Sequence, residues 1–257
     1  MSTPAARPPE LDGAPLFLLD ELPACLTGGS ELLVGGAEGR HAVDVLRLAP
    51  GERVRIGDGA GTIAEGEVLL AGPDGLRVRV TARLEVPEPQ PRLVLVQALP
   101  KGDRGPLAVE LATELGVDRI VPWAAARCVT RWREDRVAKG QQRWQAVAHA
   151  ASKQSRRPRI PEVAELASTR EVCGELAEVD LALVLHEQAR ARLAEVAVPS
   201  SGTVAIVVGP EGGLTDGEVL AFRAAGAQPV RLGPEVLRTS TAGAAALAAV
   251  SLRTRWS

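Results

Sequence analysis

The sequence predicts an α/β protein in two parts: a strand-rich domain over residues 1–86 and a second domain over residues 92–257 built on a mostly parallel sheet. Three observations lead to this prediction. A proline-rich stretch at residues 86–91 divides the chain, because alternating prolines favour an extended connection and cannot continue a helix. Before it, short alternating segments are separated by glycine-rich turns. After it, apolar runs alternate with helical patterns.

The N-terminal part is expected to form a small barrel or sandwich. Its strands are predicted at Arg53–Ile56, Thr62–Leu70 and Leu76–Val80, with a turn at residues 72–75 between the last two. One helix is predicted over Glu38–Leu48. Regular short strands separated by glycine-rich turns are typical of both architectures, and the pattern leaves the choice between them open.

The second part is expected to alternate strands and helices. Its predicted strands are Leu93–Leu99, Arg119–Trp123, Leu181–Leu185, Thr203–Val208 and Val230–Leu232. Its first predicted helix runs from an Asp103 cap to Leu115, with Leu107, Leu111 and Leu115 on one face. The second covers Glu134–Ser155. The third begins at a Thr215–Glu218 capping box and ends at Gly226, and the last covers Ala242–Leu252. The nearly continuous apolar run at residues 93–99 indicates a strand buried on both faces, as in a parallel sheet.

Charge is distributed unevenly along the chain. The formal net charge is −2, but residues 1–91 carry a balance of −6 and residues 92–160 a balance of +8. A basic block in an acidic chain suits a polyanionic partner, because each neutralised phosphate releases counterions. It is equally typical of a solvated helix face, and charge alone does not choose between the two.

Composition and motifs exclude several classes. Three scattered cysteines argue against a disulfide framework and against a thiolate metal site, so no metal is expected. The chain shows neither a signal peptide pattern nor a run of about 18 apolar residues, which favours a cytoplasmic protein without a membrane partner. The motifs G-x-G-x-x-G, G-x-x-x-x-G-K-[ST], G-x-S-x-G and H-E-x-x-H are missing, so dehydrogenase, nucleotide triphosphatase, α/β-hydrolase and zincin readings lose their main support.

Three segments that follow apolar strands could carry chemistry. They are Leu185-His186-Glu187, the glycine-rich run at 209–213, and residues 232–242. In an open α/β sheet ligands bind beyond the carboxyl ends of the strands, so these loops could converge on one pocket. Glycines allow close approach of the backbone, whose N–H and C=O groups suit a nucleoside whose own charge is a sulfonium. Gly-Pro-Glu-Gly-Gly by itself could also be a simple turn.

Taken together, the motifs resemble one family. Leu-His-Glu, then Val-Gly-Pro-Glu-Gly-Gly-Leu-Thr-x-x-Glu, then Leu-Gly-x-x-Val-Leu-Arg-x-x-Thr-Ala occur in the order of the RsmE family, whose bacterial members methylate N3 of a uridine in small-subunit (16S) ribosomal RNA. The resemblance extends to Lys101-Gly102-Asp103-Arg104, to the Glu110–Val117 and Trp144–Ser155 segments, and to His41-x-x-x-Val45-Leu46-Arg47. It therefore covers nearly the whole chain.

The resemblance implies a fold, a cofactor and partners. The expected fold is a knotted SPOUT methyltransferase domain over 92–257, with a trefoil knot that forms the pocket for S-adenosyl-L-methionine (SAM), preceded by a PUA-like β-barrel over 1–86. The implied partner is ribosomal RNA or the small ribosomal subunit. A homodimer is also implied, with the closing helix near its interface; the alanine run at residues 242–249 would allow close packing, as it would in a buried core helix.

The resemblance also assigns site residues. Those expected to bind SAM are Leu185, His186, Gly209, Pro210, Glu211, Gly212, Gly213, Leu232, Gly233, Leu237, Arg238, Thr239, Thr241 and Ala242. Arg238 is the first catalytic candidate, because a guanidinium can stabilise negative charge on the uracil oxygens; an ion pair or a helix cap is its alternative role. Many relatives carry an acid where this chain has Ser240, so a carboxylate role would fall to Glu211 or to no residue.

The residues expected to contact RNA share a basic or polar side chain near the ends of predicted elements. They are Arg40, His41, Arg47, Lys101, Arg104, Arg127, Arg131, Gln154 and Arg156. Trp132, between two arginines, is a candidate for stacking on a base. Two other functions stay open: a SPOUT enzyme acting on a ribose 2′-OH or another RNA site, and a ribosome-assembly factor that binds RNA without catalysis.

Overall fold

The computed structural model describes residues 13–257, apart from the side chains of Glu134 and Asp135. The chain divides into two compact units. The N-terminal unit comprises the chain up to Glu88 together with Lys153–Arg159, and the C-terminal unit comprises Pro89–Ser152 and Ile160–Ser257. The short segment Lys153–Arg159 thus packs with the first unit although it follows the proline-rich linker.

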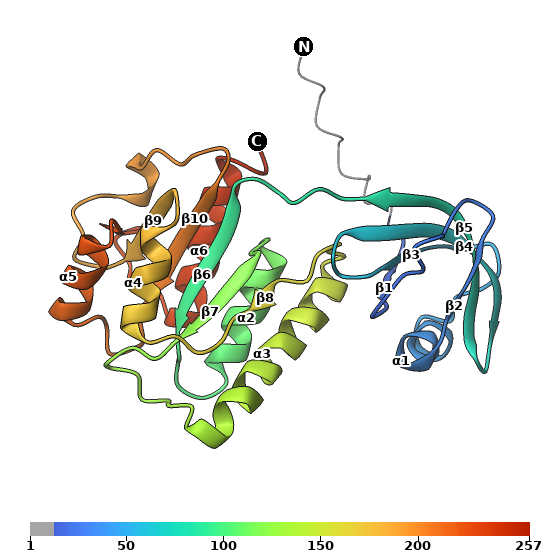
Figure 1. Ribbon diagram of the computed structural model, residues 1–257, viewed down its shortest axis with the longest axis horizontal. Helices are drawn as coiled ribbons and strands as arrows, with labels where there is room; N and C mark the ends of the chain where they lie inside the picture. The colour runs from blue at the N-terminus through green and yellow to red at the C-terminus, as the bar shows by residue number, and fades with distance from the viewer. Residues whose placement is uncertain (1–12) are drawn as a thin grey trace, which may run out of the picture. The chain divides into compact units, whose positions relative to one another are not determined.

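The N-terminal unit contains one five-stranded sheet. Its strands are β1 (Leu16–Leu18), β2 (Glu31–Val34), β3 (Arg53–Gly57), β4 (Thr62–Gly72) and β5 (Gly75–Glu85), in the order β1-β3-β4-β5-β2. Only the β1–β3 pair is parallel among these neighbours. The three predicted strands are confirmed, whereas β1 and β2 are too short to show a pattern. Figure 1 shows β4 and β5 as a long bent hairpin, which two register shifts in their pairing help to bend.

One helical segment accompanies this sheet. Helix α1 (Gly36–Arg40) continues directly into a π-helix, η1 (His41–Val45), where a single helix over Glu38–Leu48 is predicted. Ala42 is buried in the core of the unit, which also contains Phe17 and Leu76. Val45 and Leu46, by contrast, are exposed. The end of this helical segment therefore presents apolar side chains to solvent.

The C-terminal unit is built on six parallel strands. They are β6 (Arg92–Ala98), β7 (Arg119–Trp123), β8 (Glu162–Val163), β9 (Leu181–Leu185), β10 (Thr203–Val208) and β11 (Gln228–Val230), in the order β11-β9-β10-β6-β7-β8. All five pairings are parallel, which confirms the prediction from the apolar runs. The predicted strand Val230–Leu232 is placed two residues too late. Pro229 disguised the true strand, since proline is tolerated there only because β11 is an edge strand.

Helices cover both faces of this sheet (Figure 1). They are α2 (Arg104–Glu114), α3 (Glu134–Gln154), α4 (Thr169–Ala177), α5 (Asp216–Ala224) and α6 (Thr239–Leu252). Helix α6 packs on β10 and β6 and against α2, while α4 and α5 pack together beside β9 and β11. Helix α4 was not predicted, although Ser168 and Glu171 form a capping box at its start. None of the described helices is long and apolar enough to cross a membrane.

Three details of the predicted helices are wrong. Asp103 does not cap α2 with its side chain, because its backbone is not extended, and the carboxylate pairs with Arg143 at 2.9 Å instead. The inward face of α2 carries Ala108 and Val109, whereas Leu107 is 43% exposed. Helix α6 begins at Thr239, three residues before the predicted start, because the polar residues ahead of the alanine run are already helical.

Candidate functional site

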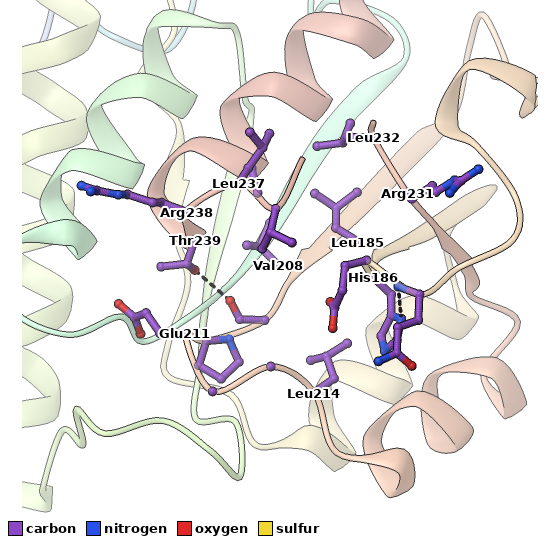
Figure 2. Close-up of a pocket in the computed structure, with 18 of the residues that line it drawn as sticks. Leu185, His186, Val208, Glu211, Leu214, Arg231, Leu232, Leu237, Arg238 and Thr239 are labelled. Carbon is purple, nitrogen blue, oxygen red and sulfur yellow. Dashed lines mark hydrogen bonds between the residues drawn. The ribbon is translucent and has the colours of Figure 1, made fainter. Parts of the chain in front are cut away.

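The loops that follow β9, β10 and β11 border one cavity of about 570 Å³ (Figure 2). Parallel strands bring their carboxyl ends to the same edge of a sheet, so the predicted convergence of the three loops is observed. Every residue predicted to bind the cofactor lines this cavity except Thr241, whose side chain is exposed on α6. Sequence reasoning missed other lining residues, among them Val208, Leu214, Asp216 and Arg231.

The glycines of the loop after β10 occupy positions where a side chain would be crowded or strained. A Cβ atom on Gly209 would lie 2.9 Å from Leu214 Cδ2, and one on Gly212 would lie 3.1 Å from Arg127 Cβ. Gly213 has φ +71°, a conformation that L side chains rarely adopt. Its N–H donates to the carbonyl of Pro210 at 2.9 Å. This loop is therefore a tight turn, and it also packs closely against neighbouring side chains.

Arg127 and Glu218 hold this glycine loop in place. Arg127 Nη1 donates to the carbonyls of Gly212 and Leu214, both at 3.1 Å. Glu218 is 5% exposed, and its carboxylate accepts bonds from the N–H of Ala126 and from the backbone and hydroxyl of Thr215, all at 2.8 Å. The predicted capping box is confirmed, but its buried carboxylate also fixes the loop after β7. Arg127, predicted to contact RNA, is committed to the loop.

A hydrogen-bonded chain joins the second and third loops. Gln97 Nε2 donates to Thr239 Oγ1 at 3.0 Å, and Thr239 Oγ1 donates to the carbonyl of Gly209 at 2.8 Å (Figure 2 draws the second bond). Gln97 is fully buried near the end of β6. It was not predicted as a site residue, although a lone amide inside the apolar run at 93–99 is the signal that could have identified it.

Glu211 connects the glycine loop to the loop after β6. Its Oε1 accepts a bond from the backbone N–H of Lys101 at 3.1 Å and lies 3.3 Å from Arg104 Nη1. Lys101 and Arg104 were both predicted to contact RNA, and of the two Arg104 lines the cavity. The Glu211 carboxylate, a catalytic candidate, is thus already engaged by two donors.

Known proteins resemble this chain along its length. Residues 87–251 match the family described as the RNA methyltransferase domain, and residues 34–81 match the RNA methyltransferase PUA domain. Ribosomal RNA small subunit methyltransferase E of Mycobacterium bovis is 49% identical over 248 residues, covering 95% of this chain and 94% of that protein. The chain belongs to the RsmE family.

Solved structures agree with this family assignment. The crystal structure of ribosomal RNA small subunit methyltransferase E from Neisseria gonorrhoeae, bound to S-adenosyl methionine, has a TM-score of 0.81 and 30% identity, covering 94% of this chain and 98% of that one. A Legionella pneumophila methyltransferase in complex with SAM has a TM-score of 0.79 and 28% identity, covering 94% and 98%. The RsmE-family fold, a PUA-like domain followed by an α/β methyltransferase domain, is therefore shared.

Arg238 and Ser240 can now be placed in this RsmE-family site. Arg238 lines the cavity at the N-cap of α6, and its exposed side chain caps nothing. Within the described residues its side chain has no acidic partner, and its backbone carbonyl, at the N-cap, accepts bonds from the N–H groups of Thr241 and Ala242. Ser240 is 3% exposed in the first turn of α6 and does not line the cavity. Position 240 of this chain is therefore a buried helical hydroxyl.

The lining fits a nucleoside that carries an amino acid group. Leu185, Val208, Leu232 and Leu237 provide apolar walls for a flat ring (Figure 2). Within the part of the chain that the structure describes, the backbone N–H groups of Gly212, Leu232 and Leu237 make no hydrogen bond. Carboxylates and guanidinium groups line the same cavity and suit a zwitterion with an additional positive charge, namely Glu187, Asp216 and Glu235 with Arg104 and Arg231.

The remaining residues predicted to contact RNA do not line the cavity. Arg40, Arg47, Gln154 and Arg156 are exposed in the N-terminal unit, where His41 is half-buried. Arg131 is exposed in the C-terminal unit. Trp132 is not a free stacking platform, because its ring packs edge to face on Trp144 with centroids 5.2 Å apart. Among the described residues no cluster of His, Cys, Asp and Glu could hold a metal ion.

Proposed function

We propose that this protein is a SAM-dependent methyltransferase that modifies N3 of a uridine in 16S ribosomal RNA. The convergence of three loops on one cavity, with the glycine loop braced and main-chain groups left unpartnered, carries the proposal. The two solved structures named above hold SAM, and relatives named ribosomal RNA small subunit methyltransferase E support the RNA substrate. SAM, when bound, supplies a methyl group on a positively charged sulfur.

The residues present fit this cofactor. Leu185, Leu232 and Leu237 would hold the adenine ring, and unpartnered backbone N–H groups would bond its edge. Main-chain donors and acceptors recognise a base without adding charge to the pocket. Asp216 and Glu235 would attract the positive groups. The trefoil knot that the family resemblance implies stays a prediction.

The chain's own residues then have to prepare the uridine. In the reaction, the N3–H bond breaks, a bond forms between N3 and the methyl carbon, and the carbon–sulfur bond breaks, with one proton released. Loss of that proton spreads negative charge over the uracil oxygens O2 and O4. Arg238, whose guanidinium is free of partners within the described residues, would stabilise this charge and favour deprotonation.

Glu211 is assigned a positioning role. Its carboxylate accepts the Lys101 N–H and pairs with Arg104, so it orients that arginine at the cavity. Proton release to water, with positioning of the uracil by the pocket, accounts for the chemistry without a dedicated carboxylate base.

The alternatives differ in substrate or in catalysis. A ribose 2′-OH or another RNA site would need a different orientation of the RNA at the same cavity, and the full-length similarity to proteins named for the small subunit favours the proposed substrate. A ribosome-assembly factor without catalysis would have no need to keep Arg238 unpaired beside a braced glycine loop.

Two measurements test the proposal. Mass mapping of 16S ribosomal RNA from a deletion strain should show one uridine that loses its N3-methyl group and regains it when the gene is restored. Calorimetry should show that the purified protein binds SAM and its demethylated product. If no uridine loses a methyl group in the deletion strain, or if a 2′-O-methyl group is lost instead, the proposed substrate is wrong. If the protein does not bind SAM, the proposal that it is a SAM-dependent enzyme is wrong.

We also propose a homodimer that forms around α6 and works in the cytoplasm, where ribosomal RNA is found. Leu252 at the end of α6 is 65% exposed and Trp256 is 53% exposed, and burial in a dimer would remove this apolar surface from water. Light scattering should report a dimer that Leu252→Asp converts to a monomer. The matched variant Leu220→Asp, 66% exposed on α5, should stay dimeric. A monomeric wild type, or equal effects of the two variants, would contradict the α6 interface.

A further inference from the structure

The loop between β11 and α6 carries the most exposed apolar side chain of the cofactor cavity. Val236 lines the cavity and is 79% exposed, more than any other large apolar residue that the structure describes. Its neighbour Leu237 is 38% exposed and belongs to the wall proposed to hold the adenine ring. A single exposed valine is ordinary on a protein surface. At the mouth of a binding cavity, however, such a side chain is placed to contact the ligands that enter there.

This loop is fixed at its ends and free along its middle. The N–H of Arg231 donates to the carbonyl of Ala191 at 3.0 Å at one end, and the carbonyl of Arg238 accepts bonds from the first turn of α6 at the other. Between them, residues 232–237 make no hydrogen bond within the part of the chain that the structure describes. The middle of the loop can therefore adjust to a ligand without breaking an internal hydrogen bond.

Val236 lies close to the arginine proposed to act on the uracil. Arg238 follows it by two residues, and two residues of chain span at most about 7 Å, so both side chains can reach one small ring. Figure 2 shows Leu237 and Arg238 on one side of the cavity and His186 on the other. Because Val236 directly precedes Leu237, it belongs to the side where charge on the uracil oxygens would be stabilised.

Phenylalanine and tryptophan rings do not line this cavity. The chain has two Phe, four Trp and no Tyr, and none of the six rings, all within the described residues, is part of the lining. A base that leaves its stack in RNA loses the contacts of its faces and regains them from aromatic or apolar side chains of the pocket that receives it. In this cavity that contact has to come from an aliphatic side chain, and on the Arg238 side the most exposed one is Val236.

We propose that Val236 packs against the face of the target uracil, so that Arg238 meets the oxygens at the edge of the same ring. This inference rests on the proposed function, because it names a residue that orients the base for that reaction. N3 of uracil lies between the two carbonyl carbons that carry O2 and O4. An apolar contact on the face and a guanidinium at an oxygen therefore fix the position of the atom that receives the methyl group.

Replacing the valine separates this contact from cofactor binding. Val236→Ser removes apolar surface from a side chain that is already exposed, so the unfolding temperature should match that of the wild type. Small ribosomal subunits from a deletion strain serve as substrate, with tritium-labelled SAM as the methyl donor. The single-turnover rate of methylation at saturating SAM should fall about tenfold, which corresponds to about 1.4 kcal/mol.

Two binding measurements accompany the rate. The dissociation constant for SAM, from calorimetry, should not change, because the adenine wall is intact in Val236→Ser. The dissociation constant for the small subunits, from filter binding, should change by no more than about twofold, because contacts to phosphates dominate the affinity for RNA. A lower rate with both affinities preserved is the signature of a misplaced base.

Val236→Ile and Leu220→Ser are the matched controls. Val236→Ile keeps a β-branched apolar side chain and should recover the rate that Val236→Ser loses. Leu220→Ser alters a side chain that is 66% exposed on α5 and is not part of the cavity lining, so its rate and both dissociation constants should match those of the wild type.

Three results would overturn the inference. If Val236→Ser weakens SAM binding and saturating SAM restores the rate, Val236 belongs to the cofactor wall. If light scattering shows that Val236→Ser changes the oligomeric state, a second copy of the chain covers the side chain. If the rate at saturating SAM is unchanged, Val236 does not orient the substrate.

Failure of the proposed function gives a different pattern. If the wild-type protein binds SAM and methylates a uridine of 16S ribosomal RNA at N3, and Val236→Ser does so at the same rate, only the role of Val236 is refuted. If the wild-type protein neither binds SAM nor methylates that RNA, the proposed function itself is refuted, whatever the variants do.

Discussion

The glycine loop of the C-terminal unit and the helical tip of the N-terminal unit are held in opposite ways. Residues 209–214 are fixed by Arg127, Glu211 and Thr239, each of which bonds a neighbouring loop or backbone carbonyl. Among the interactions that the structure describes, residues 40–47 form backbone hydrogen bonds and no side-chain hydrogen bond. Val45 and Arg47 are exposed. A small cofactor needs a preorganised pocket, whereas a polyanion needs free charged groups on a surface.

The largest effect is expected where the C-terminal unit buries a charged pair. Arg255 pairs with Asp118, donates to the carbonyls of Pro91 and Gly116, and is 9% exposed at its side chain. Arg255→Ala removes the ion-pair partner of the Asp118 carboxylate, which keeps its bond from the Leu93 N–H, and should lower the free energy of unfolding by about 3–5 kcal/mol. The control Arg83→Ala breaks an exposed pair with Glu85 in the N-terminal unit and should cost about 1 kcal/mol or less.

Urea denaturation followed by circular dichroism measures both changes. Equal losses for Arg255→Ala and Arg83→Ala would show that burial does not distinguish the two pairs. The proposed difference in how the two units use charge would then fail.

Next in size is the hydrogen-bonded chain behind the cofactor pocket. Thr239→Val removes the hydroxyl between Gln97 and the Gly209 carbonyl, so the buried Gln97 amide loses one of its two acceptors and keeps the Ala98 carbonyl, at a cost of about 1–3 kcal/mol. Because Thr239 joins the second and third loops, SAM affinity should fall roughly tenfold, or about 1.4 kcal/mol. Calorimetric titration with SAM and thermal unfolding measure the two effects.

A threonine in the other unit serves as the control. Thr81 donates to the carbonyl of Glu65 at 3.1 Å on an exposed strand, so Thr81→Val should leave SAM affinity unchanged. If Thr239→Val bound SAM as tightly as the wild type, the chain of bonds would stabilise the fold without shaping the pocket.

Much of the fold could be predicted because strands β6, β9 and β10 are apolar runs bounded by clear loop signals. The sequence also showed where each loop begins after its strand. For this reason the residues predicted to bind the cofactor are ones that lie together at the cavity. Short elements failed: β8 has two residues, and β11 contains a proline that only an edge position tolerates. In these places tertiary pairing, which is invisible in local sequence, decides the structure.

The braces of the site could not be read in the same way. The sequence predicts that Arg127, in a basic block, contacts RNA. In the structure its guanidinium donates to two carbonyls that lie 85 and 87 residues away in the chain. Gln97 and Thr239 are 142 residues apart. Polar side chains are chosen for such partners by three-dimensional proximity, and one sequence contains no record of that proximity. The residue types indicated the chemistry, and only the fold assigned the partners.

A smaller effect distinguishes two capping boxes. Glu218 and Glu171 both cap a helix start, but Glu218 is buried and also accepts the Ala126 N–H, whereas Glu171 is exposed. Glu218→Gln replaces one acceptor by a donor and should cost about 1–3 kcal/mol of unfolding free energy and weaken SAM binding. Glu171→Gln keeps a capping box that glutamine can also form, so SAM binding should be unaffected. Matching SAM affinities for the two variants would refute the link between Glu218 and the pocket.

Low pH should weaken the exposed capping box formed by Ser168 and Glu171 and leave the cofactor pocket unchanged. The hydrogen bond from the Ser168 backbone to Glu171 lowers the pKa of that carboxyl. Its contribution to stability is therefore present above the pKa of the unfolded chain and is lost as pH falls through the lowered folded-state value. Comparing the pH dependence of unfolding for wild type and Glu171→Gln below about pH 4.3 isolates this loss. Identical acid profiles would contradict it.

The smallest expected effect compares thiols of the two units. Cys25 is exposed in the N-terminal unit, whereas Cys128 is buried beside the loop after β7, and burial raises the pKa of the Cys128 thiol. Because the thiolate is the reactive form, a maleimide at neutral pH should label Cys25 within minutes and Cys128 only when the protein unfolds. Peptide mapping by mass spectrometry after short exposure distinguishes them. Labelling of both at the same rate would mean that the loop held by Glu218 opens in the native protein, and the contrast between the braced glycine loop and the exposed helical tip would no longer hold.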